Sequence, residues 1–291
     1  MTADDPTAGD RTRFAASSRR VRMGVSRFAA RDGARDLLRV PKVTAFFWVI
    51  KGLSTAMGEA TSDYLVHAVA PVVAVMVGFV GFVWALWYQL SRRRYVAAAY
   101  WTAVVMVGVF GTMAADVLHV GFHVPYLASS LLYAACLAAV FVCWQRSERT
   151  LSIHTIDSLR REGFYWAAVV STFAAGTAVG DLVANTLHLG YGRSLILFAV
   201  LILITGGAFV TGKLTAIAAF WTAYVLTRPL GASVADYLAK PRALSGRGIG
   251  DGPVCLVLLL AIVALVGVLS VTKLDVQERP RSAGRPPVRA R

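Results

Sequence analysis

The sequence carries little charge for its length. Only 16% of its 291 residues are charged, whereas 57% are hydrophobic, and the mean hydropathy is +0.60. A soluble globular domain has about 25% charged residues, so this composition excludes an ordinary soluble protein. It predicts an integral membrane protein whose outer surface faces lipid.

Other groups that would support specific chemistry are also scarce. The three cysteines, Cys136, Cys143 and Cys255, lie inside apolar runs without the paired spacing of a zinc or redox site. Histidines are missing from the middle of these runs, which argues against a haem protein. No candidate nucleophile has a credible base, so we expect no enzymatic activity.

Long apolar runs dominate what is present. Each is near the ~20 residues that a helix needs to cross the hydrocarbon of a bilayer. There are eight, at about 43–66, 68–90, 95–121, 126–144, 163–188, 193–211, 213–238 and 253–272. Unbroken runs of this kind indicate helices rather than a barrel. We therefore expect an all-α polytopic bundle with eight transmembrane helices.

Acidic residues are outnumbered by basic ones, 16 to 30, and the net charge is +14. Basic residues gather in residues 1–42, in the tail, and in the loops that follow the second and fourth runs. By the positive-inside rule, both termini lie in the cytoplasm and the protein lies in the cell membrane. We expect residues 1–42 and 273–291 to be disordered and to contact anionic lipid, not nucleic acid.

A motif occurs four times along the chain. Each copy begins with an aromatic residue and a tryptophan, namely Trp48, Trp101, Trp166 or Trp221. A glycine follows ten residues after each tryptophan: Gly58, Gly111, Gly176 and Gly231. An aspartate follows five residues after each glycine: Asp63, Asp116, Asp181 and Asp236. Just before each aspartate is a small residue: Ser62, Ala115, Gly180 or Ala235.

The repeat predicts how the runs are organised. Each copy opens a unit of two runs, so all copies enter the membrane in the same direction. The expected membrane domain, residues 43–272, thus contains four parallel two-helix repeats at about 43–90, 95–144, 163–211 and 213–272. Glycine with a small residue four positions on forms a helix-packing face, which assigns packing to Gly58, Gly111, Gly176, Gly180 and Gly231.

The spacing within the motif also predicts depth. At a rise of 1.5 Å per residue, the tryptophan and the aspartate lie roughly 22 Å apart along a helix. The four tryptophans are therefore expected to anchor the helices at the cytoplasmic interface. The four aspartates would then lie at one depth toward the outer leaflet.

Charges inside these helices need compensation. Glu59 and the four aspartates give five acids, against two bases, Lys51 and Arg228. Each charge at this depth costs at least ~2.5 kcal/mol, so either some carboxylates are protonated or a cation lies among them. We expect Arg228 to be an internal counter-ion for Asp236 or Glu59. A cation is also favoured at the carboxyl-terminal part of each helix by the helix dipole.

Oxygen atoms dominate the candidate ion site. The carboxylates are joined by the hydroxyls of Ser62, Thr112 and Thr177, with His119 or His188 as possible additional ligands. Such donors suit Mg²⁺, Ca²⁺ or Mn²⁺. The hypothesis is a transporter or exporter of cations, either of a divalent metal such as Mn²⁺ or coupled to protons, with a bound divalent cation as the candidate cofactor. The alternative is a structural or assembly protein without transport, in which Asp and Trp only mark the interfaces.

With four tandem units and one motif tryptophan in each, residues 40–272 resemble a bacterial family of uncharacterised membrane-anchored proteins, described as a repeat of unknown function. The resemblance implies an eight-span architecture and a marked tryptophan per repeat, but it supplies no activity. The repeats are not identical. At the position of Glu59 the other three repeats have Thr112, Thr177 and Ala232, and at the position of Lys51 they have Val104, Val169 and Tyr224. We therefore expect an asymmetric site in which the first repeat dominates.

Overall fold

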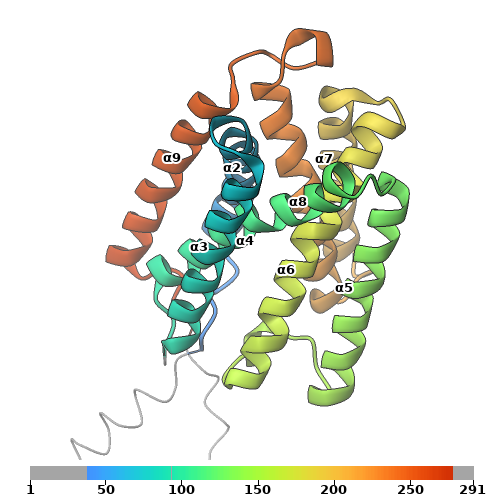
Figure 1. Cartoon of the computed structure of the whole chain (residues 1–291). Helices are drawn as coiled ribbons and strands as arrows, with labels where there is room; N and C mark the ends of the chain where they lie inside the picture. The colour runs from blue at the N-terminus through green and yellow to red at the C-terminus, as the bar shows by residue number, and fades with distance from the viewer. Residues whose placement is uncertain (1–37, 93, 278–291) are drawn as a thin grey trace, which may run out of the picture. The chain divides into compact units, whose positions relative to one another are not determined.

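A computed structural model describes residues 38–92 and 94–277. Residues 1–37 and 278–291, with most of the basic segments expected to contact anionic lipid, lie outside the described residues. Within the described part the chain is all-helical, as predicted, and holds eight long α-helices (Figure 1). These are α2 (Ala45–Ala68), α3 (Pro71–Ser91), α4 (Ala97–Asp116), α5 (Tyr126–Glu148), α6 (Leu159–Asp181), α7 (Gly190–Val210), α8 (Ala216–Ala239) and α9 (Asp251–Thr272).

Six of these helices are long and apolar enough to cross a membrane: α3, α4, α5, α6, α7 and α9. They indicate a multi-pass membrane protein. The other two, α2 and α8, are 24 residues long and carry the charged residues Lys51, Glu59, Asp63, Arg228 and Asp236. That α2 and α8 also cross the membrane stays a prediction.

Local sequence signals mark where helices begin. The hydroxyl of Thr44 accepts a hydrogen bond from the backbone N–H of Phe47 and caps α2, and Ser158 caps α6 in the same way. Pro71 occupies the first turn of α3, where its missing N–H is not needed. Short turns connect the helices: η1 (Val117–Gly121), η2 (Ile153–Thr155), η3 (Leu182–Thr186) and η4 (Arg242–Leu244).

The helices form an inner ring and an outer layer. In the ring, α2 packs on α4, α4 on α6, α6 on α8, and α8 on α2. Each outer helix packs chiefly on the inner helix that follows it in the sequence, and α9 closes the arrangement by packing on α2 (Figure 1). In the apolar stretches of α4 and α6, 56% and 67% of the residues are buried, whereas the share is 17–22% in α3, α5, α7 and α9.

Aromatic rings fill one end of the inner ring. Trp101, Trp166 and Trp221 are buried, and Trp48 is half-buried. The centroids of Tyr100 and Trp166 lie 5.5 Å apart. These tryptophans, expected to anchor helices at the lipid interface, therefore pack mainly between helices, and their depth in a membrane stays a prediction.

Both ends of the described chain meet beside this aromatic layer. The backbone N–H of Leu38 donates to the carbonyl of Gln277 (3.2 Å), and that of Lys42 donates to the carbonyl of Asp275 (2.8 Å). The Tyr95 hydroxyl donates to the Asp275 carboxylate. Burial raises the pKa of Asp275, although the hydrogen bond from Tyr95 opposes the shift. Residues 38–42 and 273–277, which lie outside the membrane domain expected at 43–272, thus bond to each other beside the helix bundle.

Candidate ion site within the helix ring

The motif glycines lie where neighbouring inner helices cross. A methyl group on Gly58 would lie 2.8 Å from the carbonyl carbon of Gly108 on α4, and one on Gly111 would lie 2.9 Å from Cβ of Phe173 on α6. Gly176 faces Arg228 on α8, and Gly231 faces Thr55 on α2. In all four cases the residue faced lies seven positions after the motif tryptophan. One contact therefore recurs around the closed ring.

Arg228 occupies the inside of this ring and is fully buried. Its Nη2 donates to Oε2 of Glu59 at 2.6 Å and to Oγ1 of Thr177 at 2.6 Å, and also to Oγ1 of Thr112. One guanidinium group thus joins α8 to α2, α4 and α6. The structure pairs Arg228 with Glu59, one of the two partners considered from the sequence.

The hydroxyls of Thr112 and Thr177 form hydrogen bonds with their own helices and with Arg228. Their hydroxyls donate to backbone carbonyls four residues earlier on their own helices, Thr112 at 2.9 Å and Thr177 at 3.0 Å. Their oxygen atoms then accept from Arg228. In this structure Thr112 and Thr177, expected to be ion ligands, bind the guanidinium.

Three carboxylates gather beside this ion pair. Oxygen atoms of Glu59, Asp63 and Asp236 lie within 4.8 Å of one another. Glu59 and Asp236 are buried, whereas Asp63 is half-buried. We call these three residues the carboxylate cluster. Carboxylate oxygens at this separation can share one hard cation.

The charges of the carboxylate cluster are only partly balanced. Lys240, just beyond the end of α8, pairs with Asp63 and lies 3.7 Å from Asp251. Burial lowers the pKa of Lys240, but the charge and hydrogen bond of Asp63 outweigh it and raise the pKa above its ordinary value. Among the described residues, Arg228 and Lys240 are the basic groups that pair with the cluster, so two basic groups face its three carboxylates.

The other two motif aspartates lie apart from the cluster. Asp116 and Asp181 are the last residues of α4 and α6, and each is followed by a π-helical turn, η1 or η3. Such turns are frequent at functional sites. Both aspartates remain within electrostatic reach of Glu59. The four aspartates therefore divide into a pair within the cluster and a pair at helix ends.

The remaining predicted site residues lie outside the carboxylate cluster. His119 Nδ1 forms a hydrogen bond with the carbonyl of Val124 (2.8 Å), and His188 is exposed. Among the residues that the structure describes, no histidine joins the cluster. Ser62 is buried, and its hydroxyl has no hydrogen-bond partner in the described chain. Lys51 is buried but forms no ion pair with the acids of the described part.

Two charged features were not predicted. Lys240 lies four residues after Asp236, on the same helical row, and this spacing could have pointed to it. Glu162 is fully buried and accepts from Arg39 at 2.6 Å and from Gln89 Nε2 at 3.0 Å. Glu162 lies near the aromatic end of the ring, so it belongs to a separate polar contact.

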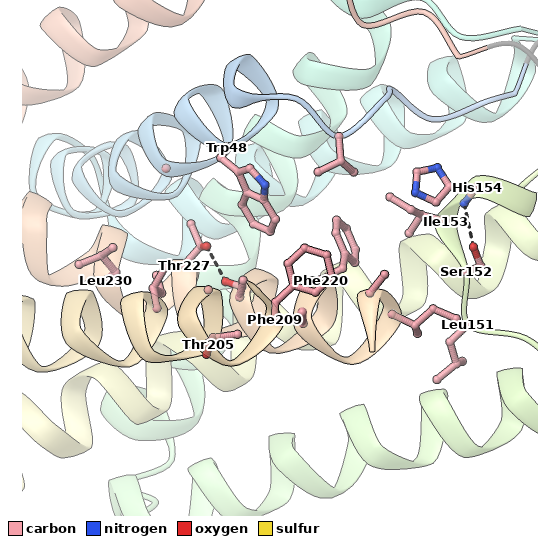
Figure 2. A pocket seen from close by; sticks show the side chains of 18 residues that line it. Trp48, Leu151, Ser152, Ile153, His154, Thr205, Phe209, Phe220, Thr227 and Leu230 are labelled. Atoms are coloured by element: carbon pink, nitrogen blue, oxygen red, sulfur yellow. Dashed lines mark hydrogen bonds between the residues drawn. The ribbon is translucent and has the colours of Figure 1, made fainter. Parts of the chain in front are cut away.

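A cavity of about 620 Å³ lies outside the ring, between α2, α7, α8 and the loop at residues 151–154 (Figure 2). Trp48, Phe209, Phe220 and Leu230 are among its mainly apolar lining residues. His154 is the ionisable residue that lines it, and it lies on the loop side. Without carboxylates, this cavity does not resemble an ion site.

The comparisons agree with the internal repeat. A family described as a Repeat of Unknown Function (DUF347) matches residues 99–150, 164–212 and 219–275, which together cover more than half of the chain. The three segments correspond to the second, third and fourth predicted repeats. No curated protein and no solved structure matches the chain.

Proposed function

The chain belongs to this repeat family, and because the family description assigns no activity, we propose from the geometry alone that the protein transports cations across a membrane. The carboxylate cluster is the proposed binding site. The ring of α2, α4, α6 and α8 is the proposed pathway, and the outer helices face lipid.

The proposed architecture has eight membrane-crossing helices in four parallel two-helix repeats around a pseudo-fourfold axis, with both termini in the cytoplasm. The glycine contact that recurs four times in one register supports it. The packing of each outer helix on the next inner helix, including α9 on α2, supports it as well. Charged residues are costly in lipid, and the charges of α2 and α8 face the ring.

The observation that carries the proposal is the uncompensated cluster. Glu59, Asp63 and Asp236 place three carboxylates within 4.8 Å, mostly buried, against two basic groups. A bound cation would remove the remaining negative charge and the repulsion among the acids. Oxygen donors suit a hard divalent ion such as Mn²⁺, while protonation of one carboxylate is the other solution.

A flux assay tests the proposal. Purified protein is reconstituted into liposomes that contain a fluorescent indicator for divalent cations, and uptake of Mn²⁺, Mg²⁺ and Ca²⁺ is measured. We expect flux of one of these ions, reduced at least about tenfold in Asp236→Asn, because the cluster loses a charged ligand. Glu148→Gln is the matched control, since Glu148 pairs with Arg160 and Arg161 outside the cluster. Equal flux in both variants would contradict the proposal.

The glycine contacts favour one other candidate, a structural or assembly protein without transport. In that case Asp236→Asn would leave cellular function intact, whereas bulk at Gly58 would abolish it, because only helix packing would matter. Comparing the two variants in cells separates the candidates.

A further inference from the structure

The amine of Lys51 is an anomaly in the middle of the ring. Its side chain is fully buried, and Nζ has no hydrogen-bond partner within residues 38–92 and 94–277. An ammonium group offers three donors and no acceptor, so burial without a partner disfavours its charged form. Lys51 is eight residues before Glu59, which places it roughly 12 Å along α2 from the carboxylate cluster.

Aromatic rings enclose the amine instead. Lys51 Nζ lies 4.0 Å from the ring centroid of Phe173 on α6 and 4.3 Å from that of Tyr224 on α8. The faces of aromatic rings attract a cation, and this attraction is strongest where water is excluded. Two ring faces therefore favour the ammonium, while burial favours the neutral amine.

The neighbouring helices define the charges around Lys51. From α8, Arg228 acts on it as a like charge, and Arg228 also lies over the Phe173 ring at 5.5 Å. Tyr224 of α8 has a buried hydroxyl that interacts with the hydroxyl of Tyr165 on α6. From α4 and α6, Tyr100 and Tyr165 share a hydrogen bond between their hydroxyls.

The outer helices next to α2 contribute apolar side chains to the same core, such as Leu86 of α3 and Ile262 of α9. Among the described residues, no acid pairs with Lys51. The two ring faces thus favour the protonated amine of Lys51, whereas burial and the charge of Arg228 favour the neutral amine. No described acid acts as a fixed counter-ion.

We propose that Lys51 Nζ is a proton-binding site of the helix ring, separate from the carboxylate cluster. The proton comes from solvent and returns to it, and the amine changes between a neutral and a charged form. The inference deepens the proposed function, on which it rests for its role, by naming the proton as the coupling ion. A positive charge on Lys51 repels the guanidinium of Arg228, which binds Glu59 of the carboxylate cluster. A proton on Lys51 and a cation in the cluster therefore weaken each other's binding. This coupling predicts exchange of protons for the cation.

Nuclear magnetic resonance of lysine labelled at Cε tests the site without any transport assay. The chain has few lysines to resolve: Lys42, Lys51, Lys213, Lys240 and Lys273. We expect one resonance, absent in Lys51→Met, to titrate at lower pH than the resonances of the other four lysines. A Lys51 resonance that titrates together with those of the other lysines would overturn the proposal.

A second variant covers the case in which Lys51→Met does not fold. Phe173→Leu removes one ring face and keeps the amine, so the midpoint should fall by roughly half a pH unit or more. An unchanged midpoint would overturn the role of the aromatic rings. Saturating Mn²⁺ should lower the midpoint in the wild type but not in Asp236→Asn, and no shift in either would overturn the coupling. Absence of flux with an intact titration would reject transport and leave the proton site standing.

Discussion

Replacing Arg228 with methionine tests the centre of the ring. The substitution keeps most of the side-chain volume and removes the guanidinium that binds Glu59 at 2.6 Å. Breaking a buried ion pair by removing one partner costs about 3–5 kcal/mol, because the other charge is left buried and uncompensated. We expect a loss of unfolding free energy of that size for Arg228→Met, and a fall in melting temperature on the order of 10 °C.

The assay is unfolding of the purified protein in mixed micelles with increasing SDS, followed by tryptophan fluorescence. Glu59→Gln should cost a similar amount, since it leaves Arg228 unpaired. The double variant should be more stable than either single variant by about 1–3 kcal/mol, because neither charge remains. Arg160→Met is the control: its pair with Glu148 is at 3.3 Å and its side chain is 68% exposed, so it should cost no more than about 1 kcal/mol. Single-variant costs that simply add would refute the reasoning.

Two further predictions concern helix packing and pH. Gly58→Ala should destabilise the protein by about 1–3 kcal/mol, because its methyl group would meet the backbone of Gly108. Gly206→Ala is the control: it has open space around it, so it should be neutral or stabilising by up to ~1 kcal/mol. Equal melting temperatures of the two variants would contradict the packing role of Gly58. Burial raises the pKa of Asp275 above its unfolded value of about 3.9, so the folded state holds this proton more tightly and loses stability as the pH rises through that range. On lowering the pH from about 7 to 4, the wild type should therefore gain melting temperature relative to Asp275→Asn, and a constant difference would speak against the shift.

The internal repeat made much of the arrangement predictable. The equal spacing of Trp, Gly and Asp predicted that α2, α4, α6 and α8 carry corresponding residues at corresponding positions. In the structure Gly58 lies against Gly108, and Asp236 lies beside Asp63. Helical spacing also singled out Glu59 and Arg228 as buried charges without showing which pairs form. Their contact spans 169 positions in the chain, so only tertiary packing could select it.

Sequence periodicity could not predict the asymmetry of the site. The motif gives four equal aspartates, yet α4 and α6 end at Asp116 and Asp181 in π-helical turns, while α2 and α8 continue past theirs. The surroundings of Lys51 were equally hidden, since its aromatic neighbours come from α6 and α8. Contacts between distant helices leave no trace in the spacing of a single run.

The most direct test of the central claim is the thermal stability of detergent-purified protein in Mn²⁺, Mg²⁺ and Ca²⁺. A cation that binds only the folded state stabilises it, by about 2.7 kcal/mol at a hundred times its Kd. The carboxylate cluster predicts stabilisation of the wild type by one of these ions, its loss in Asp236→Asn, and its retention in Asp116→Asn, whose carboxylate lies outside the cluster. A flat response of the wild type to every cation, or equal stabilisation of Asp236→Asn, would contradict a cation site at Glu59, Asp63 and Asp236.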